Sequence, residues 1–212
     1  MKALSSKNWK YFLGPLSKDN PVVVQILGIC SALAVTAQLK PAFVMTASVV
    51  VVTAFANLIM SLLRKGVPGR IRIIVQLVVI AFLVILVDQV LKAYVYDVSK
   101  QLSVYVGLII TNCILMGRVE AFALGNKPWP AFIDGVANGV GYGVILLMLG
   151  FVRELFGSGS LWGVRIVPEA WYIQNGGWYA NNGLMMLPPM ALILVGLIIW
   201  VHRSSNKDLI EK

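Results

Sequence analysis

Six long apolar segments follow one another along the chain, and short connections with polar residues separate them. They cover residues 21–38, 42–63, 71–91, 101–118, 132–152 and 184–201, with the ends placed approximately. About 20 helical residues cross the ~30 Å hydrocarbon core of a bilayer. A helix also satisfies its own backbone polar groups, which lipid cannot do. The pattern predicts an all-α integral membrane protein whose residues 1–212 form a single transmembrane domain of six helices.

The composition indicates that lipid is the solvent for much of this chain. Hydrophobic residues make up 58% of the 212 residues and charged residues 13%, whereas soluble domains carry roughly 25% charged residues. So little charge cannot cover the surface of a soluble domain of this size. The net charge of +9 does not indicate nucleic-acid binding, because Lys and Arg stand in the connections and form no basic face.

The distribution of Lys and Arg predicts the orientation of the chain. With the N-terminus in the cytoplasm, the inner segments hold 13 of the 18 basic residues and the outer segments hold five. Cytoplasmic connections of membrane proteins carry such an excess, so both termini are predicted to lie in the cytoplasm. The long outer connection, residues 153–183, is rich in Trp and Tyr. These residues prefer the headgroup layer, and we expect this connection to lie along the outer surface or against a partner.

The two cysteines occupy matching places in the two halves of the chain. Cys30 lies in the first apolar segment and Cys113 in the fourth, each roughly a dozen residues or slightly fewer from the start. Because each half has three spans, the second half enters the membrane from the opposite side, which is compatible with an inverted 3+3 repeat. At ~1.5 Å per helical residue, both sulfur atoms are expected near the bilayer centre.

Three interpretations of Cys30 and Cys113 compete. Free cysteine behaves as a small hydrophobic residue, so two inert buried thiols are the simplest interpretation. A disulfide deep in the membrane of a protein facing the cytosol is disfavoured. In the third interpretation the thiolates bind metal. An iron–sulfur cluster takes four cysteines, so a partner chain would have to supply two. The single histidine, His202, excludes a site built from several imidazoles.

Small and polar residues surround both cysteines. They are Gly28, Ser31, Thr111 and Asn112. Such residues allow close packing of helices and can also donate hydrogen bonds to sulfur, so the two explanations stay open. Pro21 and Gly107 are predicted points at which helices one and four can be broken, as in transporters.

Two carboxylates in the apolar segments are candidates for a Na⁺ pathway, because a charge in the membrane is costly. Asp88 lies near the outer end of the third segment and Asp134 near the start of the fifth. Amide side chains that could help to bind a cation are Asn57, Gln76 and Asn138. Structural explanations stay open: Asp88 can pair with Lys92 one turn later, and Asp134 can be a charge at a helix N-terminus.

Four glycines in the fifth segment predict a helix face that packs closely on a neighbouring helix. They are Gly135, Gly139, Gly141 and Gly143. No strand precedes them, so they do not form a phosphate-binding loop. The sequence shows no dinucleotide-binding fingerprint or flavin-attachment signal, and neither NAD nor flavin is expected to bind this chain.

Longer runs of residues resemble a known family. The runs are Leu27–Thr36, Val87–Tyr94, Ile109–Arg118 and Arg153–Gly159. They are similar to motifs of the D subunits of Na⁺-translocating NADH:quinone reductases, and the cysteine motifs are shared with the related E subunit of the Rnf ferredoxin:NAD⁺ complex. The resemblance covers nearly the whole chain, and the Thr-Asn-Cys and Arg-Glu-Leu-Phe-Gly-Ser-Gly runs are the specific ones.

The resemblance implies a six-helix inverted-repeat fold in the bacterial inner membrane, paired with a homologous E subunit of opposite orientation. Each chain would give two cysteines, here Cys30 and Cys113, to a shared iron–sulfur cluster, expected to be [2Fe–2S], that relays electrons across the membrane. Flavins, NADH and quinone would bind other subunits, so this chain would be part of an enzyme without being catalytic alone. Asp88 and Asp134 match the family's candidates for Na⁺ handling. Lys40 departs from the family pattern, in which an acidic residue is expected.

Other functions stay open at this stage. Within the family, the chain could be the equivalent subunit of an Rnf-type complex. A cofactor-free secondary transporter with inverted repeats would also place polar groups at the midplane. A purely structural subunit would tolerate replacement of both cysteines and both aspartates.

Overall fold

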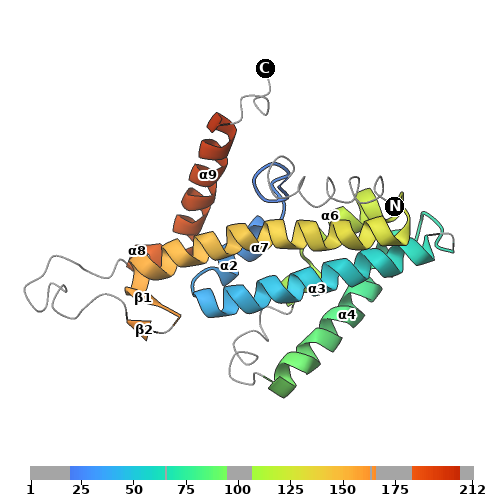
Figure 1. Ribbon diagram of the computed structural model, residues 1–212, viewed down its shortest axis with the longest axis horizontal. Coiled ribbons are helices and arrows are strands. Elements are labelled where there is room, and N and C mark those ends of the chain that lie inside the picture. Colours follow the sequence, from blue (N-terminus) through green and yellow to red (C-terminus); the bar gives the residue numbers. More distant parts are fainter. Residues whose placement is uncertain (1–19, 65, 95–106, 163, 166–182, 206–212) are drawn as a thin grey trace, which may run out of the picture.

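A computed structural model describes residues 20–64, 66–94, 107–162, 164–165 and 183–205 (Figure 1). Its long helices are α3 (Leu39–Leu63), α4 (Arg72–Tyr94), α7 (Pro128–Ser158) and α9 (Pro188–Ser205). All four are long and apolar enough to cross a membrane. They correspond to the second, third, fifth and sixth predicted spans, and they confirm an α-helical membrane protein.

Helix α7 is longer than the predicted span at both ends. Proline at its first position suits a helix start, because that residue needs no intrahelical hydrogen-bond donor. The helix ends at Gly159, which adopts the left-handed conformation with φ of 64°, a common helix terminator. Arg153 and Glu154, assigned from the sequence to an outer connection, therefore belong to the last two turns of α7.

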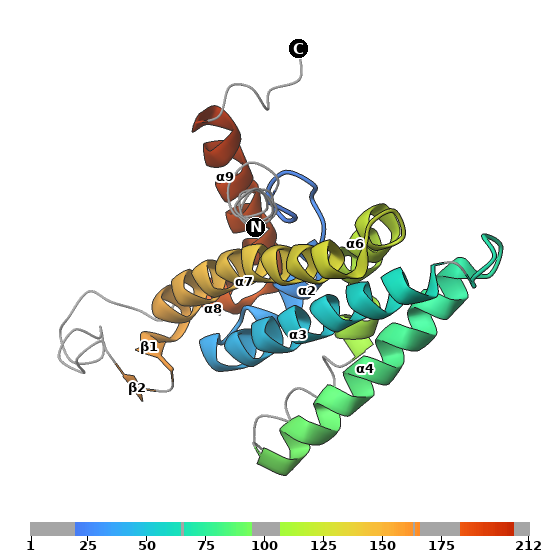
Figure 2. The ribbon, with the colours of Figure 1, turned by 45° about the vertical axis from the view of Figure 1, so that its right-hand side comes forward.

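Helices α3 and α7 lie side by side and antiparallel at the centre of the molecule (Figures 1 and 2). A Cβ atom on Gly139 would lie only 2.8 Å from the Cα atom of Val50, and one on Gly135 would lie 2.9 Å from the Cα atom of Ala54. The two backbones approach so closely because α7 has no side chain at these positions. The predicted glycine packing face is confirmed for Gly135, Gly139 and Gly143, whereas the carbonyl of Gly141 accepts a hydrogen bond from Asn20 Nδ2.

Helices α4 and α9 lean away from this central pair on opposite sides (Figures 1 and 2). Large apolar side chains cover their outer faces, including Val78 and Phe82 on α4 and Trp200 on α9, which are 60–69% exposed. Apolar stripes of this size would promote aggregation in water. They are compatible with contact to lipid tails or to the apolar surface of another membrane protein.

The first and fourth predicted spans are interrupted in the part of the chain that the structure describes. Residues 21–27 form turns, and the short helix α2 (Ile29–Val35) begins only after Gly28. In the fourth span, a helical stretch at 107–110 stops, and α6 (Cys113–Arg118) starts after Asn112 and continues into the π-helix η1 (Val119–Ala123).

The second interruption corrects the prediction that Gly107 marks it, whereas Pro21 is the first residue of the turns in the first span, and the chain before residue 20 lies outside the described residues. Gly107 lies in helical structure, where its carbonyl accepts a hydrogen bond from Thr111 N. The chain instead changes direction at Gly28, with φ of 78°, where a residue with a Cβ atom is strained. At the second interruption, the Asn112 side chain accepts a hydrogen bond from Ile114 N and so caps a new helix.

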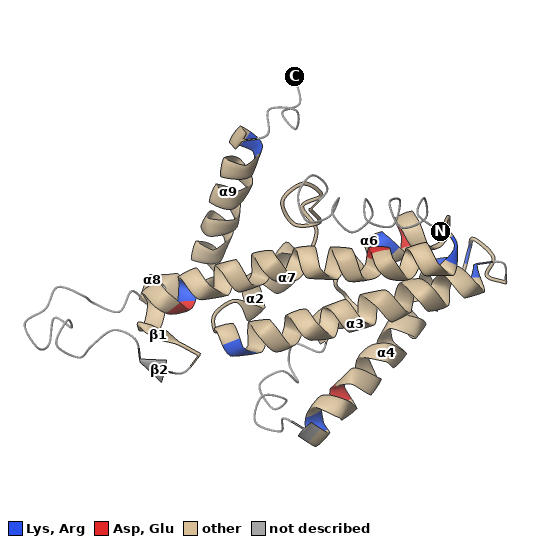
Figure 3. Cartoon of the chain, in the orientation of Figure 1, with Lys and Arg blue, Asp and Glu red and all other residues tan. Residues whose placement is uncertain are grey.

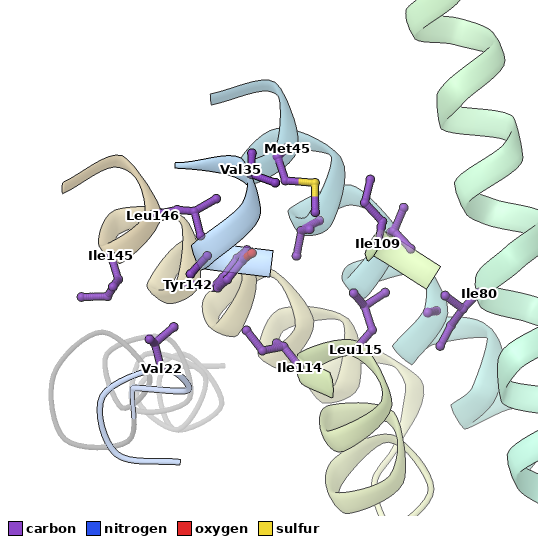
Figure 4. Close-up of a cluster of buried hydrophobic side chains, with 14 of the residues drawn as sticks. Val22, Val35, Met45, Ile80, Ile109, Ile114, Leu115, Tyr142, Ile145 and Leu146 are labelled. Carbon is purple, nitrogen blue, oxygen red and sulfur yellow. The ribbon is translucent and has the colours of Figure 1, made fainter. Parts of the chain in front are cut away.

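The buried core joins these interrupted segments to the central helices. Figure 4 shows Ile114 and Leu115 of α6 in the same buried cluster as Val35 of α2, Met45 of α3 and Tyr142 of α7. Among the described residues, a small antiparallel pair of strands, β1 (Ser160–Leu161) and β2 (Val164–Arg165), follows α7. The short helix α8 (Gly183–Met186) leads into α9. Trp171, Tyr172, Trp178 and Tyr179 of the predicted outer connection lie outside the described residues.

Candidate metal centre

Both cysteines stand where an interrupted span resumes as a helix. Cys30 is the second residue of α2, and Cys113 is the first residue of α6. Both are free thiols on the surface of the isolated chain. They are therefore accessible to a metal or to a partner chain, and they are not enclosed within the core of this chain.

A hydrogen bond brings the two interruptions together. The Gly28 N–H donates to Cys113 Sγ over 3.3 Å, so the sulfur of one cysteine lies beside the backbone two residues before the other. A Cβ atom on Gly28 would lie 2.6 Å from Ile114 Cδ1. Both the left-handed conformation and the close approach of α6 therefore require glycine here.

Ser31 connects the two cysteine-bearing turns to α7. Its hydroxyl donates to Gly28 O over 2.9 Å. Because that hydrogen is used, the Tyr142 hydroxyl is the donor in the 2.7 Å bond to Ser31 Oγ. Asn112 Nδ2 also donates to Ser31 Oγ, over 3.3 Å. One buried hydroxyl thus holds the turn before Cys30, the cap of the Cys113 helix and the central helix.

Tyr142 shows the depth of this network within the helix bundle. It lies within one residue of the midpoint of α7, a helix of 31 residues. At ~1.5 Å per residue, α7 is about 46 Å long and extends beyond a ~30 Å hydrocarbon core at both ends. If the helix is centred in the bilayer, the network lies close to the mid-plane.

The side chains at this site suit part of a metal centre that is ligated by thiolates. Cysteine thiolates are the ligands of iron–sulfur clusters, which take four of them. In the described part of the chain, no group of three or more His, Cys, Asp and Glu side chains comes together that could hold a metal alone. Two accessible thiols on neighbouring turns, with an N–H donor to one of the sulfur atoms, therefore fit half of a shared cluster.

Asp134 is buried and paired. Its carboxylate accepts hydrogen bonds from Arg118 Nε at 3.1 Å and Arg118 Nη2 at 2.5 Å. Asn138 Nδ2 donates to Asp134 Oδ1 over 3.0 Å, and Asn57 Nδ2 donates to the nearby Ala131 carbonyl. These acceptors fix the orientation of both amides. Oδ1 of Asn57 and of Asn138 is left buried without a hydrogen-bond partner among the described residues.

A second charged cluster lies near this pair, on α4 and η1. Arg72 and Glu120 form an ion pair, and Gln76 Nε2 donates to the other oxygen of Glu120 over 2.6 Å. Figure 3 shows acidic and basic residues close to α6, at the end of the molecule where α7 begins. Gln76, predicted as a possible helper to a cation, instead binds Glu120.

Asp88 stands apart from these residues near the C-terminal end of α4. Its carboxylate lies 2.6 Å from Lys92 Nζ, one helical turn later. The structure thus joins the turn before Cys30 to Cys113 through the Gly28 hydrogen bond and bears out the pairing of Asp88 with Lys92. It places the two predicted aspartates in different ion pairs.

Sequence reasoning missed the roles of Tyr142, Arg118 and Arg153. Arg153 is 1% exposed although it was assigned to a surface connection. A signal was available, because a basic residue within a continuous apolar helical pattern must face the interior or snorkel. For Tyr142 no sequence signal pointed to the Ser31 contact, because the two residues are 111 positions apart.

The fold and the site define a polytopic α-helical membrane protein with two thiols on interrupted helices. Residues 8–199 match the family model Rnf-Nqr, described as "Rnf-Nqr subunit, membrane protein". The chain belongs to this family, which confirms the resemblance seen in the sequence.

Individual relatives give the same result. The D subunit of the Na(+)-translocating NADH-quinone reductase of Pseudomonas aeruginosa is 58% identical over 197 residues, covering 93% of this chain and 87% of the relative. The D subunit of the same name from Aeromonas hydrophila is 56% identical over 202 residues, covering 95% of each chain. That of Proteus mirabilis is 56% identical over 203 residues, covering 96% of each.

Proposed function

We propose that this chain is a membrane subunit of a Na⁺-translocating NADH:quinone reductase, in which Cys30 and Cys113 provide two of four thiolate ligands to an iron–sulfur cluster. A homologous E subunit in opposite orientation would provide the other two. The observation that carries the proposal is the Gly28 N–H···Cys113 Sγ bond, which places the thiol of Cys113 beside the turn that precedes Cys30. The names of the relatives supply the reaction.

The contacts between α3 and α7 support an inverted repeat as the basis of this arrangement. The run Pro-Ala-Phe occurs at 41–43 in α3 and again at 130–132 in α7, 89 residues later. The closest contacts are Thr46–Gly143, Val50–Gly139 and Ala54–Gly135. Adding 89 to the residue number in α3 and subtracting 89 from the number in α7 converts the Thr46–Gly143 contact into the Ala54–Gly135 contact. The same operation converts the Val50–Gly139 contact into itself. A twofold axis through the Val50–Gly139 contact requires this correspondence. Interrupted helices in both halves also agree with such repeats.

Within this proposal, the chain's own residues bind and position the cluster. The cluster supplies one-electron transfer when it is bound. The thiolates of Cys30 and Cys113 would ligate iron, and the Gly28 N–H would donate to a ligating sulfur, a contact that tunes reduction potentials. Ser31 and Asn112 hold the two turns at a fixed separation. NADH, flavins and quinone would bind other subunits.

The charge distribution supports a location in the bacterial inner membrane with both termini in the cytoplasm. Helix α3 ends and α7 begins at one end of the molecule, where Figure 3 shows a group of basic residues. Arg64 follows α3, Arg72 begins α4 and Lys127 precedes α7. Among the described residues, Lys40 and Arg153 lie at the opposite ends of α3 and α7, Lys92 near the end of α4, and Arg203 near the end of α9. The excess of basic residues favours the first end as the cytoplasmic one.

We further propose that Asp134 contributes to the Na⁺ pathway and that Asp88 has the lesser role. Na⁺ binds oxygen ligands, and two buried carboxamide oxygens, Asn57 Oδ1 and Asn138 Oδ1, have no partner among the described residues. Both belong to side chains that contact residues 131–134 of α7. Arg118 occupies both oxygens of Asp134, so Na⁺ would bind this carboxylate only when Arg118 moves.

The cluster proposal is tested with Cys30→Ser and Cys113→Ser in the purified complex. Each change is expected to remove the iron and acid-labile sulfide of one cluster, together with its electron paramagnetic resonance (EPR) signal and NADH:quinone turnover. Ala34→Ser, which adds a hydroxyl one turn further along α2, is the matched control and should retain all of them. Normal iron content and turnover with both cysteines replaced would refute the proposal and favour a structural subunit.

The Na⁺ proposal is tested with Asp134→Asn and Asp88→Asn in the same complex. Asp134→Asn is expected to raise the Na⁺ concentration needed for half-maximal turnover, because it removes a charge beside two unpaired oxygens. Asp88→Asn should have the smaller effect, since its partner Lys92 is 44% exposed and exposed ion pairs contribute little. An unchanged Na⁺ dependence in Asp134→Asn would contradict the assignment.

A further inference from the structure

Arg153 is a buried guanidinium whose hydrogen bonds are complete without a carboxylate. It is 1% exposed, and all five of its N–H groups have an acceptor. The acceptors are Met185 O for Nε (3.0 Å), Thr36 Oγ1 (2.6 Å) and Leu33 O (3.3 Å) for Nη1, and Met186 O (2.8 Å) and Leu187 O (3.3 Å) for Nη2. Because all of its N–H groups are hydrogen-bonded, the Arg153 side chain acts as a fixed connection between the elements that carry the acceptors.

These acceptors belong to the C-terminal ends of two short helices. Leu33 and Thr36 end α2, and the three carbonyls at 185–187 end α8 and begin the turn to α9. The last carbonyls of a helix have no partner within it, and unpaired carbonyls are costly where water is excluded. Lysine could not replace Arg153 here, because an ammonium group has three donors and no planar fork.

The neighbouring residue Glu154 holds the other side of the same turn. Its Oε2 accepts a hydrogen bond from Leu39 N over 2.5 Å, and Leu39 is the first residue of α3. Arg153 therefore holds the chain before the α2–α3 turn and Glu154 holds it after the turn. A Cβ atom on Gly157 would lie 3.0 Å from Met186 Sδ, so glycine at this position lets α8 come within reach of Arg153.

We propose that Arg153 is a positioning residue for Cys30, and this role rests on the proposed function of that thiol as an iron ligand. Helix α2 has seven residues, about 10 Å in length, and a helix this short is not stable on its own. Its direction is set by anchors at its ends. The Ser31 network holds the end that carries Cys30, and Arg153 holds the opposite end.

Among the described contacts, none connects Arg153 to the helix that carries Cys113. Replacement of Arg153 should therefore affect the segment around Cys30 and leave the segment around Cys113 unchanged. Arg64 offers a matched control, because it lies at the C-terminal end of α3 and donates from Nη1 to Asn126 O over 2.9 Å. It corresponds to Arg153 under the 89-residue shift. The carbonyl that accepts from Arg64, Asn126 O, follows the η1 segment, whereas the acceptors of Arg153 include residues at the end of α2.

The test uses the intact complex with Arg153→Lys, Arg153→Gln, Thr36→Val or Arg64→Lys. Hydrogen–deuterium exchange is measured for peptides covering 29–36 and 113–118. The EPR spectrum and midpoint potential are measured for the signal that Cys30→Ser abolishes. Thr36→Val keeps the charge and the shape but removes one acceptor of Arg153, together with the hydrogen bond from the Thr36 hydroxyl to Ala32 O. Unchanged exchange in this variant therefore decides against the role of Arg153 if neither Arg153 variant assembles.

In Arg153→Lys, exchange in 29–36 is expected to rise about tenfold or more, the effect of losing hydrogen bonds from a charged donor. Exchange in 113–118 should stay unchanged, and the g-values and midpoint potential should shift. Thr36→Val should act in the same direction to a smaller extent, and Arg64→Lys, whose acceptor follows η1, should leave exchange in 29–36 unchanged. Arg153→Gln, if it assembles, should exceed Arg153→Lys in each effect.

Two results would overturn the role of Arg153 while leaving the cluster proposal intact. One is a wild-type exchange rate at 29–36 in Arg153→Lys or, if that variant fails to assemble, in Thr36→Val. The other is faster exchange with an unaltered EPR signal and potential, which would make Arg153 a structural residue only. If no iron signal in the wild-type complex depends on Cys30, the proposed function itself fails, and the positioning role fails with it.

Discussion

Replacing Gly28 by alanine tests whether the hydrogen bond between the two interrupted spans depends on close backbone approach. Two separate costs apply. Gly28 has φ of 78°, and a residue with a Cβ atom in this left-handed region costs about 1–2 kcal/mol. The new Cβ would also lie 2.6 Å from Ile114 Cδ1 and 3.1 Å from Tyr142 Cε2, and overpacking of this kind costs about 1–3 kcal/mol.

Together these terms predict a destabilisation of the Cys30–Cys113 region by about 2–5 kcal/mol, a large part of the stability of a typical domain. The assay is the thermal loss of the Cys30-dependent EPR signal from the purified complex, with bound iron measured in parallel. Gly196→Ala is the control, because a Cβ atom on Gly196 in α9 would have no atom of another segment within 4 Å. This control should be neutral or slightly stabilising.

A second change separates the two costs. Ile114→Val removes the Cδ1 atom that the new Cβ at position 28 would strike. On its own, this change lowers the stability by about 0.5–1.5 kcal/mol. In the Gly28→Ala/Ile114→Val double variant, the steric part should be relieved and the backbone part should persist. The double variant is therefore expected to be less destabilised than the sum of the single variants. Simple additivity, or a Gly28→Ala complex with wild-type thermal stability and iron content, would refute the reasoning.

Two further predictions concern the central helices. Gly139→Ala should prevent normal assembly of the complex, because its Cβ would lie 2.8 Å from the Cα atom of Val50 and backbone cannot yield as a side chain can; normal yield on gel filtration would contradict this. Tyr142→Phe should lower stability by about 1 kcal/mol through loss of one buried hydrogen bond. Ser31→Ala should cost more, because Ser31 makes three hydrogen bonds; equal thermal midpoints for these two variants would disprove the ranking.

The sequence predicted the spans that form continuous helices well and the interrupted ones less well. Continuous spans depend on a local property, the length of an apolar run against the thickness of the bilayer. Interruptions depend on single residues whose conformation is fixed by distant contacts. Gly28 takes its left-handed conformation beside Ile114, a residue of the other half of the chain, whereas Pro21 and Gly107 looked more suitable from composition alone.

The ends of the spans were misplaced for a related reason. Arg153 and Glu154 are charged, and a hydropathy pattern ends a span where charges begin. In the structure their polar groups are satisfied by the ends of α2, α8 and α3, so α7 continues to Ser158. Asp134 likewise lies inside α7, because Arg118 from the preceding segment neutralises its charge.

The sequence by itself determined that this chain belongs in a membrane, that its glycines pack helices closely and that its two cysteines lie in the first and fourth apolar segments. Each of these follows from hydropathy, residue size or position along a helix, which are local quantities. Only the tertiary structure decided that Gly28 reaches Cys113 and that Arg153 joins three elements. The first contact links residues that are 85 positions apart, and the contacts of Arg153 with α2 link residues that are 117–120 positions apart. No pattern confined to one segment specifies which distant donor meets which acceptor.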